Sequence, residues 1–435
     1  MKSILPILLL LPLISADEYA VLVSGSTGYW NYRHQADICH AYQVLLSHGF
    51  NPAHIILFSY DDVPSDPLNP FPGQLYNSPG NQSRDVNAGC VKDYTGEDVN
   101  VANFLAVLKG NATEIQGGNG KVLHSGPEDD VFINFVDHGA PGLVSFPDTY
   151  LYADQLNSTF AYMSQHQMYR SLLFYLESCE SGSMFYEILP TDMSVLAVTA
   201  ANYNETSMAT YCYPNDTVNG VHLDTCLGDL FSVNWMEDCD KHPNLGQETV
   251  YEQYLRVKRL TFESDVMWYG NESRLDSSLS SFMGSGIAQK SEIPLSSRVN
   301  WNSYDVKLQT LETIYRNHPT ELNSQAVTTE ILYRQRVEET FDLISQYLDQ
   351  SGEERLLQGQ LPVRDFECLR GAVEAFQQEC GQIQDYALQY LQILVNACEA
   401  GHSLAQMQGA FSQACADPPA ELRLEQLQVN PFIRL

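Results

Sequence analysis

The sequence is poor in basic residues. Its 435 residues include 23 Lys and Arg against 54 Asp and Glu, which gives a formal charge of −31 at pH 7. The acidic residues are spread along the chain rather than gathered in a tail. Because a surface of this sign repels phosphate groups, we expect neither nucleic acid nor an anionic membrane among the partners.

Long apolar runs are missing after the N-terminus. The first residues, MKSILPILLLLPLISA, contain one Lys, an apolar stretch too short to span a bilayer comfortably, and small residues at Ser15 and Ala16. They predict a secretory signal peptide over residues 1–16. No later segment is apolar for long enough to form a transmembrane helix, so we expect a protein of the secretory pathway, either secreted or in a vacuole or lysosome.

Sequons of the form Asn-x-Ser/Thr suit that compartment, because they are N-glycosylation acceptors in organisms that glycosylate. Six are present and are candidate glycosylation sites: Asn81, Asn111, Asn157, Asn204, Asn215 and Asn271.

The ten cysteines are also typical of an oxidising compartment. Four of them lie together in the last part of the chain, where three pairings are possible: Cys368, Cys380, Cys398 and Cys415. We expect a small, separate, disulfide-bonded domain there.

Apolar runs of strand length alternate with segments of helical periodicity over residues 17–280. The runs are YAVLVSGS, HIILFSY, DVFINFVDHG, SLLFYLESC and SVLAVTAA, each bounded by Gly, Asp or Pro. This alternation is typical of βαβ units. We therefore predict an α/β fold with a mostly parallel sheet flanked by helices, and functional residues at the carboxyl ends of its strands.

The sequence changes character after residue 280. Residues 281–325 are mixed and contain Gly, Ser, Pro and several Asn, which predicts a linker with some helix inside it. Apolar residues then recur at spacings of three to five from Leu332 to Leu348. We predict a small all-helical domain of four or five helices over residues 326–435, pinned by two disulfides.

Two of the apolar runs end in reactive side chains. In VFINFVDHGAPG the apolar run is followed by His138, and in LLFYLESCESG it is followed by Cys179. If both are strands of one parallel sheet, the two side chains can meet at its edge as a thiol and imidazole pair. A single Cys in a secreted protein is more often half of a disulfide, but the joint pattern favours catalysis, because a glycine follows each residue closely. Glu177 should point to the same side of the strand as Cys179, whereas Glu180 is expected to be solvated.

Long matching stretches then identify a family. GYWNYRHQADICHAYQ, KDYTGEDV, VDHGAPG, ESCESGSMF and CLGDLFSVNWMED, together with the C-terminal cysteines, resemble the legumains, or vacuolar processing enzymes, of the asparaginyl endopeptidase family. The resemblance spans nearly the whole chain. It implies a caspase-like fold followed by an inhibitory prodomain, no cofactor and no metal ion. It also implies a cysteine endopeptidase whose substrates are peptides and proteins with an exposed Asn.

The roles of the family transfer to particular positions. By this resemblance Cys179 is the nucleophile, His138 is the catalytic base and acid, and Asn31 orients the imidazole. Gly139 and the amide of Cys179 are the oxyanion donors. Asp137 matches a position that can carry a succinimide. The asparagine pocket is built from Arg33, His34, Glu177, Ser207 and Asp229.

The pocket residues suit an asparagine side chain. A carboxamide presents a carbonyl that accepts hydrogen bonds and a nitrogen that donates them, so its pocket needs an Arg and carboxylates. A substrate Asp would lose a donor and place a negative charge against Glu177 and Asp229. We therefore expect weaker cleavage after Asp, confined to acid pH. Without the surrounding motif, Arg33 and Asp229 would indicate only a structural ion pair.

The same site serves hydrolysis and ligation. Attack by Cys179 leaves a thioester, which water resolves in a protease and an incoming amine resolves in a peptide ligase. Ala140 and Pro141, two and three residues after His138, and Met208 occupy places where small changes resemble those of ligating members. Ordinary packing variation explains them equally well, so ligation stays an alternative. An inactive binding or storage homologue is disfavoured, because nucleophile and base are both present.

The resemblance also implies a zymogen, in which the prodomain covers the site and is released in acid. Residues 321–435 contain 17 acidic and 7 basic residues, a formal −10, which leaves −21 on the remainder. Docking must therefore depend on local pairs between carboxylates and Arg or Lys, which protonation weakens. We expect autocleavage after an Asn near the linker, with four candidates: Asn300, Asn302, Asn317 and Asn323.

Three disulfides are implied by the resemblance. They are Cys212 with Cys226, Cys368 with Cys398, and Cys380 with Cys415. Three cysteines besides Cys179 stay unassigned: Cys39, Cys90 and Cys239.

Overall fold

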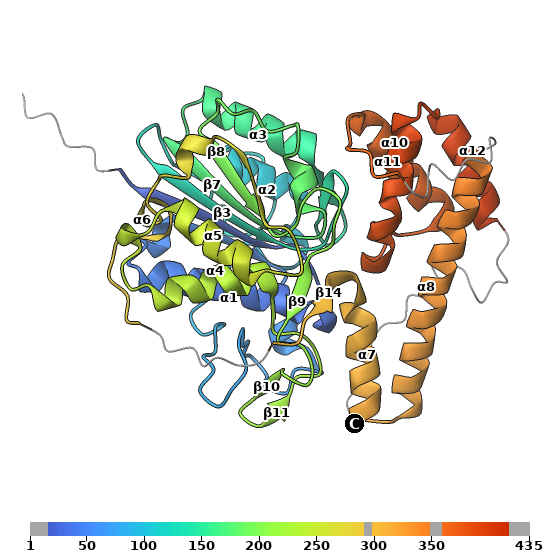
Figure 1. Cartoon of the computed structure of the whole chain (residues 1–435), viewed down its shortest axis with the longest axis horizontal. Coiled ribbons are helices and arrows are strands. Elements are labelled where there is room, and N and C mark those ends of the chain that lie inside the picture. The colour runs from blue at the N-terminus through green and yellow to red at the C-terminus, as the bar shows by residue number, and fades with distance from the viewer. Residues whose placement is uncertain (1–15, 291–297, 349–358, 417–435) are drawn as a thin grey trace, which may run out of the picture.

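The computed structural model describes residues 16–290, 298–348 and 359–416. The predicted signal peptide lies outside these residues, apart from Ala16. Within them the chain forms an α/β unit and a helical unit that lie side by side (Figure 1). None of the helices in these ranges is long and apolar enough to cross a membrane.

A six-stranded sheet forms the centre of the α/β unit. Five of its strands are parallel, and β13 at one edge runs antiparallel to β8. The order across the sheet is β13 (Met267–Gly270), β8 (Val195–Thr199), β7 (Ser171–Glu177), β3 (Asp130–Val136), β1 (Glu18–Ser24) and β2 (Ile55–Ser59). The five predicted apolar runs are the five parallel strands, so the predicted α/β fold with a mostly parallel sheet is confirmed.

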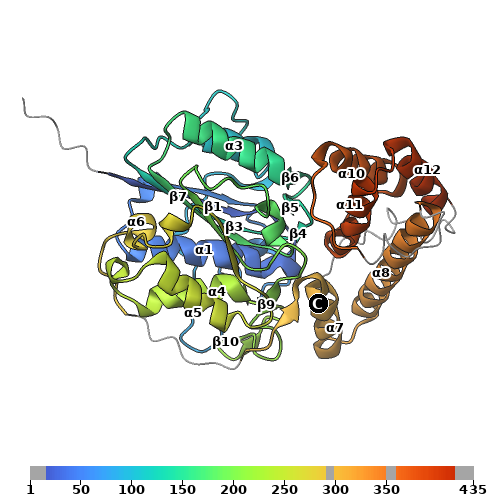
Figure 2. The same ribbon diagram turned by 45° about the horizontal axis from the view of Figure 1, so that its top comes forward.

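Helices cover both faces of this sheet (Figures 1 and 2). One face carries α1 (Tyr32–Ser47), α4 (Leu230–Lys241) and α5 (Val250–Leu260), and the other carries α2 (Val101–Leu108) and α3 (Ala153–Gln165). Strand β1 shows why its run is continuously apolar. Leu22 packs into the core on the α1 side, and its neighbour Val23 packs into the core on the α2 side.

Short strands surround the carboxyl edge of the sheet. One small sheet contains β4 (Gly139–Ala140), β5 (Leu143–Ser145) and β6 (Tyr150–Tyr152), which lie next to the helical unit in Figure 2. In another, β9 (Met208–Thr210) pairs antiparallel with both β12 (Gly228–Asp229) and β14 (Trp301–Asn302). The remaining pair is the hairpin β10 (Thr217–Val218) and β11 (Val221–His222).

The linker predicted over residues 281–325 contains regular structure. It includes the end of α6 (Ser280–Met283), then β14, and then α7 (Val306–Asn317), which contacts the segment Tyr29–Asn31 of the α/β unit. Helix α8 (Glu321–Leu348) begins before the predicted domain boundary at residue 326 and runs across it.

Three further α-helices complete the described part of the helical unit: α10 (Phe366–Cys380), α11 (Leu391–Glu399) and α12 (Leu404–Cys415). Their core continues into the α/β unit, because Ala140 and Cys179 belong to the same cluster of buried residues. The two units therefore share one apolar interface at the edge of the sheet.

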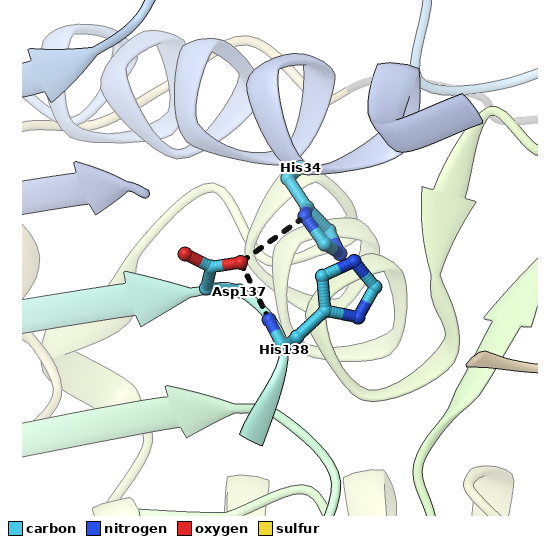
Figure 3. Close-up of side chains that lie close together, drawn as sticks. All are labelled: His34, Asp137 and His138. Atoms are coloured by element: carbon cyan, nitrogen blue, oxygen red, sulfur yellow. Dashed lines mark hydrogen bonds and ion pairs between the residues drawn. The ribbon is translucent and has the colours of Figure 1, made fainter. Parts of the chain in front are cut away.

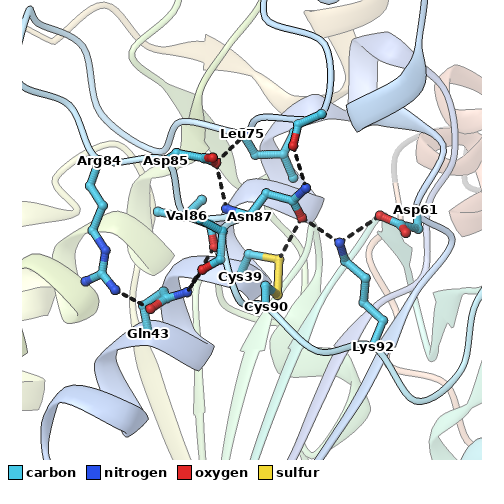
Figure 4. Close-up of a disulfide and its surroundings, with 12 residues drawn as sticks. Cys39, Gln43, Asp61, Leu75, Arg84, Asp85, Val86, Asn87, Cys90 and Lys92 are labelled. Atoms are coloured by element: carbon cyan, nitrogen blue, oxygen red, sulfur yellow. Dashed lines mark hydrogen bonds and ion pairs between the residues drawn. A yellow bond between two sulfur atoms is a disulfide. The ribbon is translucent and has the colours of Figure 1, made fainter.

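The three predicted disulfides are present: Cys212–Cys226, Cys368–Cys398 and Cys380–Cys415. A fourth joins Cys39 of α1 to Cys90, in the long loop between β2 and α2 (Figure 4). An ion pair between Lys92 and Asp61 holds the same loop nearby. Cys239 is a buried free thiol.

One candidate glycosylation site is closed by the fold. Asn157 lies in α3 with 7% of its surface exposed. Its side-chain nitrogen donates hydrogen bonds to the carbonyls of Ala153 and Met184. Because both amide hydrogens are engaged inside the protein, the predicted glycan at Asn157 is wrong. The other five sequon asparagines are partly or fully exposed.

Candidate active site

Cys179 stands two residues after β7 and is 1% exposed. The amide of Ser207 lies 3.4 Å from its sulfur, and the Ser207 hydroxyl lies 3.7 Å away. Burial, and then the neighbouring Glu180 carboxyl group, raise the pKa of the thiol well above its usual range. In this form the side chain of Cys179 is therefore a neutral thiol.

His138 reaches the same edge from the neighbouring strand. Val136 of β3 lies opposite Glu177 of β7, so the residues that follow each strand are neighbours. The Nε2 atom of His138 is 2.9 Å from Asn31 Oδ1, which also accepts from Arg33 Nη1 at 3.2 Å. Because a guanidinium only donates, the shared Asn31 atom is oxygen, and Nε2 carries the imidazole proton.

The other imidazole nitrogen is the one available for chemistry. Nδ1 of His138 is buried without a hydrogen-bond partner. In the tautomer fixed by Asn31 it holds a lone pair, as a base must. The thiol of Cys179 is hydrogen-bonded to Ser207 in this form.

His34 packs beside His138 (Figure 3). The two rings meet edge to face with centroids 5.0 Å apart, and Nδ1 of His34 lies 2.6 Å from the hydroxyl of Ser26. Burial, followed by the charges of Arg33 and His138, lowers the pKa of His34 well below its ordinary value. His34 is therefore a neutral wall of the site rather than a second charged group.

Asp137 precedes His138 and is 3% exposed. Its Oδ1 accepts the amide of His138 at 2.6 Å, and burial raises the pKa of its carboxyl group well above the ordinary value. The carboxyl group therefore lies against the nitrogen that would attack it in succinimide formation.

The predicted pocket residues converge next to Cys179. Arg33, Glu177 and Asp229 are each at most 1% exposed. Arg33 Nε donates to Asp229 Oδ1 at 2.9 Å, and Glu177 Oε2 accepts from the amide and hydroxyl of Ser232 at 2.9 and 3.0 Å. Burial, and then the charge of Asp229, raise the pKa of Glu177 well above its ordinary value.

Sequence reasoning missed Asp37 as part of this site. Asp37 follows Arg33 by one turn of α1 and is fully buried. Its Oδ2 accepts the amide of Asp229 at 3.0 Å, and its Oδ1 accepts from Asn77 at 2.6 Å. The signal that could have found it is its spacing of four from Arg33, which places both on one helix face.

The interpretation of Glu180 as a solvated residue is wrong. Glu180 is 8% exposed, and its Oε2 lies 2.7 Å from the hydroxyl of Tyr304, which is also 2.8 Å from the carbonyl of Gly139. Burial raises the pKa of Glu180 to about 8. Since Tyr304 has one proton for two oxygens, a protonated Glu180 completes the network by donating to the tyrosine oxygen.

The linker covers the edge of β9 beside Cys179. In β14, Trp301 pairs with Ala209 and Asn302 pairs with Met208. The amide of Ser303 then donates to the carbonyl of Ser207 at 3.2 Å. An extended peptide adds to a free strand edge by the same antiparallel hydrogen bonds, and in this form β14 occupies the edge of β9.

A residue of the helical unit contacts His138 directly. Asp385, just before α11, lies 3.2 Å from His138 Nε2, and Asn31 Nδ2 lies 3.3 Å from the same carboxylate. Burial acts to raise the pKa of Asp385, but the combined effects of His138, Lys307 and Asn31 outweigh burial, and the pKa falls below its ordinary value. A cavity of about 500 Å³ remains beside His138, between the α/β unit and Asp385.

The positions compared with ligating members also lie at this interface. Ala140 in β4 is fully buried in the core shared with the helical unit, and Pro141 lines a small hollow against Val363. Met208 is half-buried in β9. All three therefore border the covered site.

Two of the four cleavage candidates are closed in this form. Asn323 lies in α8, 7% exposed, and donates to the carbonyl of His318 at 2.8 Å. Asn302 is paired within β14. Asn300 accepts from Thr210, and Asn317 ends α7 at an exposed turn, where it donates to Asp224 at 2.7 Å.

Comparison with known families agrees with this geometry. The family described as Peptidase C13 matches residues 18–285, and the legumain prodomain matches residues 325–415. The chain belongs to the peptidase C13 family. The C13 match covers the α/β unit with both His138 and Cys179, and the prodomain match covers the helical unit. The protein is a cysteine peptidase with a legumain prodomain.

Named relatives resemble this C13 peptidase along most of its length. It is 39% identical over 428 residues to the vacuolar-processing enzyme of Citrus sinensis, covering 93% of this chain and 86% of that one. It is 40% identical over 412 residues to legumain of Bos taurus, covering 92% and 93%. A crystal structure of caspase-1 from Spodoptera frugiperda matches with a TM-score of 0.35 and 11% identity, over 64% of this chain and 92% of that one.

Proposed function

We propose that this C13 peptidase cleaves peptides after Asn, and more weakly after Asp in acid. The observation that carries the proposal is a set of three buried atoms without hydrogen-bond partners, in a cluster where Arg33 pairs with Asp229: Arg33 Nη2, Glu177 Oε1 and Asp229 Oδ2. One donor beside two acceptors complements a carboxamide, whose carbonyl accepts from Arg33 and whose nitrogen donates to the carboxylates. Filling the pocket removes the cost of leaving these groups unpaired.

The reaction follows from the positions of the two catalytic groups. Nδ1 of His138 takes the thiol proton, and the Cys179 sulfur attacks the carbonyl of the Asn residue. Backbone amides at Gly139 and Cys179 hold the oxyanion, and the imidazolium then protonates the leaving amine. A thioester on Cys179 remains and is hydrolysed.

The same proposal makes the described form an acid-activated zymogen. Three contacts support inhibition: β14 covers the substrate edge of β9, Tyr304 covers Gly139, and Asp385 pairs with His138. The relative from Citrus sinensis is named a vacuolar-processing enzyme. We propose an acidic vacuole or lysosome as the site of activation, with cleavage at the half-buried Asn317, where α7 ends.

A peptide asparaginyl ligase is the second candidate. Ala140 and Met208 border the covered site, where they can alter how water or an amine reaches the thioester. This placement alone does not favour ligation over hydrolysis, because one methyl group in an apolar pocket changes the free energy by only about 1 to 3 kcal/mol.

One experiment tests both candidates. Acid-activated protein and its Cys179→Ala variant are incubated with an Asn-containing peptide and an amine-terminated acceptor, at pH about 4.5 and 6.5, and the products are weighed. Fragments ending in Asn are expected from the active protein alone. Hydrolysis products alone at both pH values would overturn the ligase candidate, and no turnover would overturn both.

A further inference from the structure

We propose that Arg33 has a second role, as a positioning residue that transmits occupancy of the asparagine pocket to the catalytic histidine. This inference rests on the proposed function, because it concerns the same pocket. In the proposed pocket, the guanidinium of Arg33 is expected to form hydrogen bonds only with the substrate and with Asp229. The geometry points to a third connection, from the guanidinium through Asn31 to His138.

The three nitrogens of Arg33 have separate partners. Nε donates to Asp229 at 2.9 Å, Nη1 donates to Asn31 Oδ1 at 3.2 Å and to the carbonyl of Trp30 at 2.9 Å, and Nη2 has no partner. Asn31 Oδ1 also accepts from His138 Nε2 at 2.9 Å. One oxygen atom therefore joins the specificity pocket to the catalytic base.

Local structure sets this connection. Asn31 ends a 3₁₀ turn and is the N-cap of α1, and Arg33 lies in the first turn of that helix. Asn31 is held at its other side by Nδ2, which donates to the carbonyl of Thr27 at 3.0 Å. Asn31 contacts the imidazole and Arg33 belongs to the pocket. Because both lie within residues 31–33, the local backbone fixes their positions relative to each other.

Burial makes the connection stiff. Arg33 is fully buried, so water does not replace a hydrogen bond lost at its guanidinium, and Asn31 and His138 are each 3% exposed with the helical unit in place. A guanidinium is a rigid planar fork, so a movement at Nη2 or Nε also moves Nη1. When a substrate carbonyl binds Nη2, the fork is fixed at all three corners, and Asn31 then holds the imidazole in the orientation that catalysis requires.

The inference is tested by alkylation of Cys179 with iodoacetamide, measured across pH in acid-activated protein. This reaction reports the thiol and imidazole pair and needs no residue in the pocket. Arg33→Lys keeps the positive charge near Cys179 but cannot hold Asp229 and Asn31 at once. We expect it to reduce the alkylation rate near pH 6 about tenfold and to change the shape of the pH profile.

A double-mutant cycle separates positioning from unrelated damage. Asn31→Ala should reduce alkylation by about as much as Arg33→Lys, and the double variant should lose no more than Asn31→Ala alone. Arg256→Lys is the matched control, because Arg256 also donates through Nε to an aspartate, Asp238, away from the site. An unchanged profile in Arg33→Lys, or additive losses in the double variant, overturns the proposal.

Thermal melting shows whether Arg33→Lys folds. If it does not, a binding measurement on Asn31→Ala tests the same coupling. Coupling is reciprocal, so Asn31→Ala should also raise the inhibition constant of a product peptide ending in Asn, by about fivefold. An unchanged inhibition constant contradicts the coupling. Failure of the wild type to cleave after Asn, with the alkylation results intact, would instead overturn the proposed specificity and leave the positioning role standing.

Discussion

Two glutamates beside Cys179 have opposite surroundings, although only two residues separate them. Glu177 ends β7 and turns into the pocket, where Ser232 donates to it twice. Glu180 has a φ of 46°, a left-handed conformation that directs the chain away from the strand and toward Tyr304. Strand alternation predicts the side of Glu177, but no periodicity applies to Glu180 beyond the end of the strand.

Glu177→Gln tests the pocket chemistry. The pKa of Glu177 is raised, so in acid this residue is protonated and can donate to a substrate Asp, whereas above the raised pKa it is ionised and repels one. We expect the variant to lower kcat/KM after Asn about 10-fold to 100-fold and to remove most of the pH dependence of cleavage after Asp. Peptides that differ only in Asn or Asp, assayed from pH 4.5 to 7, provide the measurement. An Asp rate that still falls steeply with pH would contradict this role.

Tyr304→Phe tests the cover over the nucleophile. The variant loses the hydroxyl that contacts Gly139 and Glu180, at a cost to the closed form of about 1 kcal/mol, or roughly fivefold in opening. Alkylation of Cys179 in the uncut zymogen should accelerate by that factor at neutral pH. Tyr315→Phe in the exposed part of α7 is the matched control and should leave the rate unchanged. Equal rates in the two variants would mean that Tyr304 does not limit access.

At the scale of elements, the sequence pattern predicts the strands that are buried on both faces of the sheet and misses the strands that are not. The five parallel strands are continuous apolar runs, and their register brings His138 and Cys179 to one edge as expected. Strand β13 is half-buried throughout and gives no such run. Strand β14 forms because it pairs with β9, more than 90 residues earlier in the chain, and a local pattern carries no information about that partner. The Tyr304 contact with Glu180 was unpredictable for the same reason.

The disulfide between Cys39 and Cys90 tethers the helix that carries Arg33 and His34. It closes a separation of 51 residues, so its removal enlarges the unfolded ensemble substantially. The double variant Cys39→Ser/Cys90→Ser should lose about 2 to 4 kcal/mol of unfolding free energy. Thermal unfolding of the activated peptidase unit measures this loss. Cys239→Ser, which removes a buried free thiol, is the comparison and should unfold at nearly the wild-type temperature.

Cleavage in the linker should occur after Asn317. This residue ends α7 at an exposed turn, whereas Asn323 is buried inside α8 and cannot become extended without unfolding the helix. We expect Asn317→Ala to slow acid autocleavage at least tenfold and Asn323→Ala to leave it unchanged, because a protease binds an extended chain. Mass spectrometry of the fragments identifies the cut. A wild-type fragment that ends at Asn323 would contradict the assignment.

At the scale of the whole molecule, two carboxyl groups respond oppositely to acid. The lowered pKa of Asp385 stabilises docking above its ordinary value of 3.8, and this contribution is lost as the pH falls below it. The pKa of Glu180 is raised from 4.5 to about 8, so docking takes up a proton between these values and weakens as the pH rises. Of these two groups only Asp385 favours release in acid, and it does so only below pH 3.8.

Asp385→Asn tests this balance. It removes the charge that faces His138, so uncut zymogen should open more readily at pH 5 to 7 and depend less on acid. Glu180→Gln should have the opposite effect and close the zymogen more tightly near pH 7, because docking no longer requires a proton. Binding of the separated helical unit to activated Cys179→Ala protein, measured by titration calorimetry across pH, gives both effects. The same direction of change in both variants would contradict the assignment.

The exposed turn after α7 has a further consequence for inhibition in a cell. A cut at Asn317 leaves β14 and α7 on the peptidase unit, while α8 and the following helices are held only by their contacts. The inhibitor then changes from an attached part of the same chain to a free partner, whose hold depends on its concentration. Dilution would release it, and confinement in a small organelle would retain it, so the volume of the compartment becomes a regulator of activity alongside its acidity.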